Sequence, residues 1–119
     1  MDSRAIEEIR LRTRSRVLEL RFSDGGHCEL PFEYLRVYSP SAEVQGHGPG
    51  QEVLVTGKEN VRIVEVEPVG NYAVRLVFDD GHDSGLYTFA YLQALGAQQQ
   101  ENWRTYLARL EQAGVRRSG

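Results

Sequence analysis

The chain has 119 residues, of which 40% are hydrophobic and 26% are charged, so it is long enough to bury a core without cross-links. No apolar run approaches the roughly 20 residues that span a bilayer, and the mixed charges of residues 1–20 argue against a secretory signal. Cys28 is the single cysteine, which excludes an intrachain disulfide and favours the reducing cytoplasm.

Charge is unevenly distributed along the chain. Residues 1–21 and 101–119 each carry a net charge of +2, whereas residues 22–100 carry −7. Nucleic-acid binding draws much of its affinity from the neutralisation of phosphates, so the acidic centre argues against a nucleic acid as a partner. The sequence therefore predicts neither a nucleic-acid-binding protein nor a membrane protein.

The first third of the chain has the period-two pattern of half-buried strands. Leu18 and Leu20, for example, alternate with Glu19 and Arg21. The glycines of 23–26 suit a tight hairpin turn, and the proline that follows the returning strand suits the first turn of a helix. We expect three strands and one short helix, near residues 7–12, 16–22, 27–31 and 32–38.

The middle of the chain begins with a predicted loop. Residues 39–51 are rich in Ser, Pro and Gly, and loops of this length in compact domains are either functional or disordered. Strand signals return at 53–55. The apolar phase slips within the strand expected at 61–67, which indicates a β-bulge or burial of both faces, and clean alternation resumes at 72–78.

Two helices are expected towards the C-terminus. The first spans about 88–95 and ends at Gly96. The second spans about 98–113 and ends at Gly114, and we expect the residues after it to fray. Its apolar stripe, at positions i, i+3, i+4 and i+7, consists of Trp103, Tyr106, Leu107 and Leu110. We expect this stripe to pack on the sheet.

These elements predict an α+β fold in a single domain over 1–119, with its core in about 5–96 and the C-terminal helix near 98–113. The sheet is expected to be mainly antiparallel. A short helix follows the first hairpin, and two helices follow the last strand.

The segment 79–85 concentrates groups that can bind metals. It holds three carboxylates, one imidazole and one hydroxyl, where a strand gives way to a helix. The candidate ligands for iron or zinc are His82, Asp80, Asp83 and, from the glycine-rich loop, His47. The alternative is structural: Asp80 starts a turn, Asp83 or Ser84 caps the next helix, and His47 is a solvated loop residue. We favour the structural interpretation.

No complete catalytic set is visible. Lys58 follows a Thr-Gly pair but precedes Glu59, so the phosphate-binding loop motif fails. The sequence also lacks a cysteine zinc pattern, the spaced His-x-Asp iron motif and a nucleophile elbow. His27 and Cys28 are neighbours in a predicted strand and point to opposite faces, so we interpret Cys28 as a core residue. A stand-alone enzyme is the least favoured class.

Four stretches together carry a family resemblance. They are Phe22-Ser-Asp-Gly, the run from 30 to 50 that begins Leu-Pro-Phe-Glu-Tyr-Leu-Arg-Val-Tyr, Glu67-Pro-Val-Gly-Asn-Tyr-Ala, and Phe78-Asp-Asp-Gly-His-Asp-Ser-Gly-Leu-Tyr. Over about residues 5–96 the chain resembles small bacterial proteins that are named for their likeness to the N-terminal domain of gamma-butyrobetaine hydroxylase. In that family the domain also occurs attached to P-loop iron–sulfur carrier proteins.

The resemblance has implications for metal binding and catalysis. In the hydroxylase this domain is an accessory to a separate 2-oxoglutarate- and iron-dependent oxygenase domain, and it binds zinc through three cysteines and one histidine. The resemblance places the cysteine positions at Ser39, Ser41 and Val44 of this chain and the histidine at His82. All three thiolates are missing, so a cysteine-type zinc site is not expected. Hydroxylase activity is not expected either.

We therefore expect a non-enzymatic accessory or protein-interaction module. A weak metal site around His82 is compatible with this expectation. The alternative is a small metal-binding factor linked to iron or iron–sulfur metabolism. Any cofactor is expected to be a divalent metal, iron or zinc. The expected partner is a protein, for which the resemblance suggests iron–sulfur carrier proteins, and the expected compartment is the cytoplasm.

Overall fold

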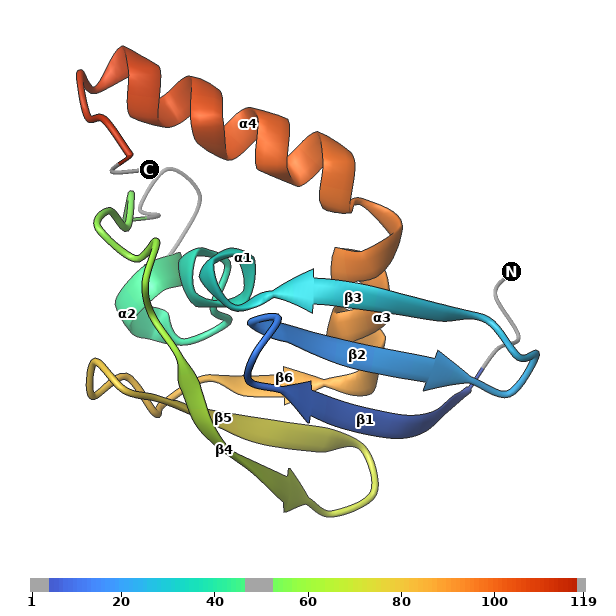
Figure 1. Cartoon of the computed structure of the whole chain (residues 1–119). Helices are drawn as coiled ribbons and strands as arrows, with labels where there is room; N and C mark the ends of the chain where they lie inside the picture. The colour runs from blue at the N-terminus through green and yellow to red at the C-terminus, as the bar shows by residue number, and fades with distance from the viewer. Residues whose placement is uncertain (1–4, 47–52, 118–119) are drawn as a thin grey trace.

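The computed structural model describes residues 5–46 and 53–117, and its first half is a three-stranded meander (Figure 1). The strands pair antiparallel in the order β1-β2-β3, and their bounds are β1 (Ile6–Arg12), β2 (Val17–Phe22) and β3 (His27–Pro31). The hairpin turn after β2 is confirmed, because Gly25 has a φ of 89° and the Phe22 amide donates to the Gly26 carbonyl.

The second half contains another three-stranded antiparallel sheet, in the order β4-β5-β6. Its strands are β4 (Ile63–Val69), β5 (Ala73–Phe78) and β6 (Leu86–Thr88). The register of β4 against β5 shifts between Ile63 and Glu65, which is the predicted bulge. The α+β class is thus confirmed, with the strands divided between two sheets and with β6 as an additional short strand.

Two short helices follow the first sheet. Helix α1 (Phe32–Val37) begins directly after Pro31, as predicted. Helix α2 (Ala42–Gln45) is capped by Ser41, whose hydroxyl oxygen accepts the Glu43 amide. The expectation of a loop without helix over 39–51 was therefore wrong at α2, and its part at 47–51 lies outside the described residues.

The strand signal at 53–55 does not produce a strand. The Val53 amide donates to the Val44 carbonyl in α2, and the Val55 carbonyl accepts the Tyr106 hydroxyl. The segment is therefore hydrogen-bonded to α2 at one end and to Tyr106 of the C-terminal helix at the other. The two valines favour a strand, but no strand among the described residues pairs with this segment.

The last two helices are α3 (Phe89–Ala97) and α4 (Gln99–Gln112). The Thr88 hydroxyl accepts the Tyr91 amide and so caps α3, which corrects the expectation that Asp83 or Ser84 caps this helix. Gly96 lies inside α3, which corrects the expectation that it ends the helix. A Cβ at Gly96 would lie 3.0 Å from Cys28 Sγ, so this glycine allows α3 to approach β3 closely.

The end of α4 agrees with the prediction only in part. Gly114 has a φ of 71°, and the Val115 amide donates back to the Leu110 carbonyl, which is how a glycine terminates a helix. The expected fraying after Gly114 was wrong for 115–117, because Arg117 binds Glu33 on α1.

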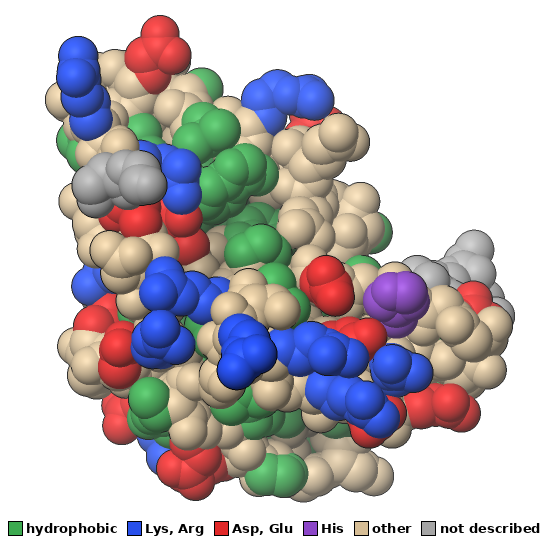
Figure 2. Space-filling model, in the orientation of Figure 1, with side chains coloured by type: hydrophobic (Ala, Val, Ile, Leu, Met, Phe, Trp, Pro, Cys, Tyr) green, Lys and Arg blue, Asp and Glu red, His purple; other side chains and the backbone are tan. Residues whose placement is uncertain are grey.

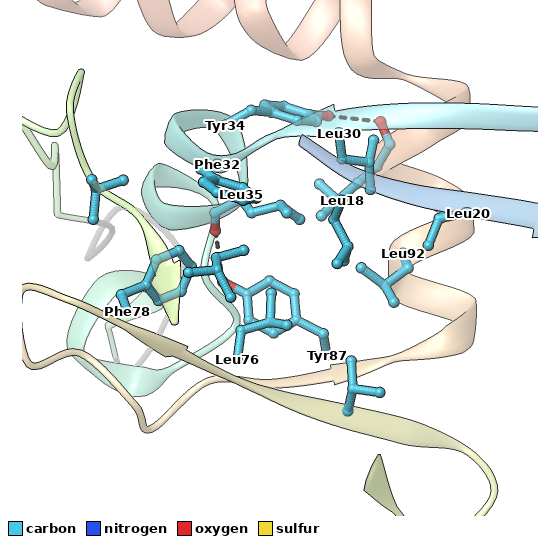
Figure 3. Packing of buried hydrophobic residues seen from close by; sticks show 14 of the residues in the cluster. Leu18, Leu20, Leu30, Phe32, Tyr34, Leu35, Leu76, Phe78, Tyr87 and Leu92 are labelled. Carbon is cyan, nitrogen blue, oxygen red and sulfur yellow. Dashed lines mark hydrogen bonds between the residues drawn. The ribbon is translucent and has the colours of Figure 1, made fainter. Parts of the chain in front are cut away.

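The main core lies between the two sheets and helices α1 and α3 (Figure 3). Its fully buried side chains come from all four elements: Leu18, Leu20, Leu30, Phe32, Tyr34, Leu35, Ile63, Leu76, Phe78, Tyr87 and Leu92. Burying each large apolar side chain contributes roughly 1.5–3 kcal/mol. No helix in the described ranges is long and apolar enough to cross a bilayer.

A smaller cluster lies beneath α4. Tyr106 and Leu110 pack against Val37 of α1, with Leu54 and Val55 at its edge. The apolar stripe of α4 therefore packs on α1 and on the 54–55 segment, which corrects the expectation that it packs on the sheet. Leu107, the fourth member of the predicted stripe, is 39% exposed.

Tyrosine hydroxyls connect these elements. Five of them donate to backbone carbonyls in other segments: Tyr34, Tyr38, Tyr87, Tyr91 and Tyr106. Burial raises the pKa of each phenol above its ordinary value, and it raises that of Tyr91 and Tyr106 to about 12. The folded chain thus keeps these phenols protonated, as hydrogen-bond donors.

Candidate functional site

The metal-ligand candidates of 79–85 lie in the connection between β5 and β6. Gly81 adopts a φ of 90°, and the amide of His82 donates to Asp80 Oδ1 at 3.0 Å. The Phe78 amide closes the loop on the His82 carbonyl. Asp80 and Gly81 therefore form the turn that the structural interpretation predicted.

Asp80 is the centre of an ion-pair cluster. Its Oδ2 lies 2.8 Å from Arg36 Nε and 2.7 Å from Lys58 Nζ, and its side chain is only 19% exposed. Burial by itself would raise the pKa of Asp80. The hydrogen bonds from Lys58, the His82 amide and Arg36 outweigh that effect and lower the pKa to about 2. The carboxylate is thus bound to two cations.

His82 is buried in the same connection. Its Nε2 lies 2.9 Å from Ser39 Oγ, and its Nδ1 lies 3.7 Å from Glu43 Oε2. Burial, followed by the field of Arg36, lowers the pKa of His82, although nearby carboxylates oppose the shift. The imidazole is therefore neutral near pH 7. The attraction of Glu43 favours the proton on Nδ1, which leaves Nε2 to accept the Ser39 hydroxyl.

Hydroxyl groups extend this contact into a network. Ser39 is fully buried and its Oγ also accepts the Ser41 amide. Ser41 Oγ lies 2.8 Å from Ser84 Oγ, which donates to Glu43 Oε1 at 2.8 Å. The network joins the segment between α1 and α2 to the connection between β5 and β6. We call it the Ser39–His82 network.

Gly85 allows the two segments to meet. A Cβ on this residue would lie 2.7 Å from Ser39 Oγ and 3.0 Å from the ring of Tyr87. Both of those side chains are fully buried and have little room to move. A glycine is required here by the close approach of the backbone to Ser39.

Three of the positions marked by the resemblance converge in this network. Ser39, Ser41 and His82 are within one set of hydrogen bonds, and Val44 is a buried residue of α2, the helix that Ser41 caps. The residue pattern alone grouped 79–85 with His47, and only the resemblance grouped Ser39, Ser41 and Val44 with His82. The spacing of about 40 residues between the two halves gives no local signal of their contact.

The candidate metal ligands do not all face one another. Asp83 Oδ2 lies 3.3 Å from Arg75 Nη1, and Asp80 is turned towards Arg36 and Lys58. His47 lies outside the described residues. Within the part of the chain that the structure describes, no three His, Cys, Asp or Glu side chains are grouped to hold a metal ion.

Ser39, His82 and Glu43 have the residue types of a hydrolytic triad. Their geometry argues against a hydrolytic role. Ser39 is 0% exposed, so no substrate carbonyl reaches its Oγ. The 3.7 Å between His82 Nδ1 and Glu43 Oε2 is longer than a hydrogen bond. The network is best interpreted as a connection within the fold.

A second candidate site lies beneath α4. A hollow of about 650 Å³ opens between α1, the start of α4 and the C-terminal segment, and it includes Pro31, Glu33, Tyr34, Gln100, Trp103 and Arg117. We call it the α4 hollow. Figure 2 shows hydrophobic side chains at the surface just beneath α4, where the molecule is indented.

Aromatic rings form the floor of the α4 hollow. The ring of Trp103 packs edge-on against Tyr34 at 6.3 Å and lies 5.2 Å from the ring of Tyr106. The helical spacing of Trp103 with Tyr106 and Leu110 predicted that its ring packs on the sheet. Trp103 is only partly buried, and it packs at the edge of both apolar clusters. No local signal distinguishes this position from a core position.

Comparisons with known proteins agree with the fold. No curated protein matches the chain. Two NMR solution structures are similar, one with 52% identity and a TM-score of 0.81 over 98% of this chain and 86% of the other. The second has 50% identity and a TM-score of 0.82 over 97% of this chain and 90% of the other.

A crystal structure is similar as well. It is of a protein of unknown function in the DUF971 family from Acidithiobacillus ferrooxidans ATCC 23270, with 47% identity and a TM-score of 0.64 over 77% of this chain and 92% of that one. The family described as "Gamma-butyrobetaine hydroxylase-like, N-terminal" matches residues 9–93. This match covers most of the chain and includes both halves of the Ser39–His82 network. The chain therefore belongs to the gamma-butyrobetaine hydroxylase-like N-terminal family.

Proposed function

We propose that the chain is a non-enzymatic accessory module that binds a partner protein through the α4 hollow. The observation that carries the proposal is the partly exposed Trp103 at the floor of the hollow, flanked by Tyr34 and Arg117. Trp, Tyr and Arg are the residue types that dominate the binding energy of protein interfaces.

The extent of the surface favours a protein over a small molecule. A second hollow of about 400 Å³ borders the first at Arg117 and includes Leu107, Leu110 and Val115. Leu107 is 39% exposed, so apolar surface continues along α4 beyond Trp103. An apolar centre with a rim of polar groups such as Gln100 is the usual composition of a protein interface.

The metal-binding alternative has less support from the contacts. A small metal-binding factor linked to iron or iron–sulfur metabolism would use His82 with Asp80 or Asp83. Both carboxylates instead lie against cations, and His82 Nε2 lies against Ser39. We keep the alternative as a prediction, together with the cytoplasm as the proposed compartment of a chain whose single cysteine is Cys28.

Site-specific photo-crosslinking in cells tests the interaction. A photoreactive phenylalanine replaces Gln100, which is exposed in the α4 hollow. The same residue replaces Tyr72 as the matched control, because Tyr72 is 52% exposed on the turn between β4 and β5, far from α4 in Figure 1. We expect one discrete adduct from position 100, none from position 72, and loss of the adduct when Trp103→Ala is added. Equal labelling from both positions, or no adduct at all, would contradict the proposal.

Catalysis is tested separately. With gamma-butyrobetaine, 2-oxoglutarate and ferrous iron, the purified protein is expected to form no succinate above a control without protein. Succinate formation that depends on the chain would overturn the non-enzymatic part of the proposal.

A further inference from the structure

We propose that the α4 hollow is a receptor for an arginine side chain of the partner, and that Arg117 of this chain fills the receptor when no partner is bound. This inference rests on the proposed function, because it names the chemistry of the partner that the hollow accepts. Three features of the hollow carry it: a buried carboxylate, an aromatic face beside it, and a removable cation between the two.

The buried carboxylate is Glu33, in the first turn of α1. Its side chain is only 10% exposed, and a carboxylate at that depth requires a cation. Arg117 supplies this cation and makes two hydrogen bonds to Glu33 through its guanidinium group. Nε donates to Oε2 at 2.9 Å, and Nη2 donates to Oε1. This parallel pair of hydrogen bonds matches the planar guanidinium fork and does not match the point charge of lysine.

The aromatic face is Trp103. The Cζ atom of Arg117 lies 5.2 Å from the centre of its ring, within the range of a cation–π contact. Trp103 is fixed from behind by Tyr34, whose hydroxyl donates to the Leu95 carbonyl and accepts from Asn102 Nδ2. The carboxylate and the ring are therefore held in place by packed helices. They form a rigid slot for a flat cation.

The occupying cation is the least constrained part of the site. Arg117 lies three residues beyond Gly114, in a segment with neither helix nor strand, and its side chain is 37% exposed. Its side chain can leave the slot while Val115 keeps its contacts with Leu110 and with the cluster beneath α4. Its departure would leave Glu33 buried without its cation, so a partner arginine that replaces Arg117 would recover the same contacts.

Charge around the slot favours a basic ligand. The hydrogen bond to Glu33 raises the pKa of Arg117, and the fields of Glu33 and Glu59 act in the same direction. A second carboxylate thus contributes negative potential at the site. Gln100, on the rim, offers amide groups to the backbone of an incoming segment. The complementary partner surface is an exposed segment that presents an arginine.

The test uses Nα-acetyl-arginine amide as the probe and the Trp103 indole resonance as the readout. The variant Arg117→Ala empties the slot, and Arg117→Met removes the charge while retaining aliphatic contact with Trp103. We expect saturable binding of the probe to both variants. Binding to the parent protein should be at least about twofold weaker, because the tethered Arg117, at an effective concentration on the order of millimolar, competes with a probe of roughly millimolar affinity.

Two controls make the test specific. Nα-acetyl-lysine amide should bind either variant at least about fivefold more weakly, since it lacks the fork. Glu33→Gln combined with Arg117→Met should abolish binding of the arginine probe. Equal affinity for both probes, undiminished binding after Glu33→Gln, or no saturable binding to either folded variant would overturn the inference.

The outcomes also separate this inference from the proposed function. If the arginine probe fails to bind while the position-100 adduct still forms, the receptor chemistry is wrong and the interaction module stands. If the probe binds and no adduct forms, the slot is real and the proposed function is wrong.

Discussion

Replacing Asp80 by Asn should destabilise the fold in a way that depends on pH. Asn retains an oxygen for the His82 amide and has nearly the same volume, so the change mainly removes the charge that binds Arg36 and Lys58. The variant therefore isolates the electrostatic part of the cluster from its packing.

The magnitude follows from the pKa of Asp80. The folded state lowers this pKa from 3.8 to about 2. Because a lowered pKa stabilises the ionised folded form, the contribution is fully present above pH 3.8 and is lost as the pH falls through 2. A shift of nearly two units corresponds to about 2 kcal/mol at pH 7. The side chain is 19% exposed, so screening by solvent is limited.

The loss of this charge also acts on Arg36, as part of the same free-energy change. Arg36 is 11% exposed, and its Nη1 is buried without a hydrogen-bond partner among the described residues. Removing the charge of Asp80 leaves this guanidinium with less compensation. A loss of 2 kcal/mol would lower the melting temperature by roughly 5–10 °C in a chain of this size.

Urea unfolding followed by Trp103 fluorescence, repeated between pH 7 and pH 2, measures the effect. The free-energy difference between parent and variant should shrink by about 2 kcal/mol over that range. Asp83→Asn is the matched control on the same loop. Asp83 is 58% exposed, so solvent screens its pair with Arg75 and the loss of its charge should have little effect on stability. A difference between the parent and Asp80→Asn that does not change with pH would refute the reasoning.

Three further predictions concern other parts of the fold. Gly85→Ala should cost about 1–3 kcal/mol in urea unfolding, because the new methyl group meets Ser39 and Tyr87; an unchanged midpoint would contradict the close approach. Buried phenols such as Tyr91 and Tyr106 have raised pKa values, so the stability that they contribute is complete below pH 10 and is lost as the pH rises towards 12. In a Tyr72→Phe variant, which removes the exposed tyrosine, tyrosinate absorbance should therefore rise together with unfolding, and a rise in the intact fold near pH 10 would count against these hydrogen bonds. On the metal-binding alternative, zinc or ferrous iron should bind weakly at His82, shift its imidazole resonances and leave the fold unchanged. Equal binding by His82→Ala would rule out the predicted metal site.

The strands were predictable from the sequence because their patterns are local. Alternation located β1, β2, β4 and β5, and the phase slip after Ile63 indicated the bulge. The elements that were missed are short. Helix α2 has four residues and β6 has three, so each depends on tertiary contacts for its stability.

The candidate site was predictable only in its local part. The turn at Asp80 follows from the Asp-Gly pair. The cations that bind Asp80 come from Arg36 and Lys58, which belong to segments far away in the chain. The slot formed by Glu33 and Trp103 is likewise long-range, and Trp103 has the same helical spacing whether it faces a core or a partner.

The division of the strands into two meanders has a consequence for the order of folding. Each sheet is built from consecutive strands, so its pairings form within a short stretch of chain. The contacts between Ser39 and His82, by contrast, close a loop of 43 residues, and those between Glu33 and Arg117 close one of 84. Because closing such loops has an entropic cost before any contact compensates for it, we expect hairpin formation within microseconds and a much slower docking step. Substitutions in the Ser39–His82 network should then accelerate unfolding more than they slow folding.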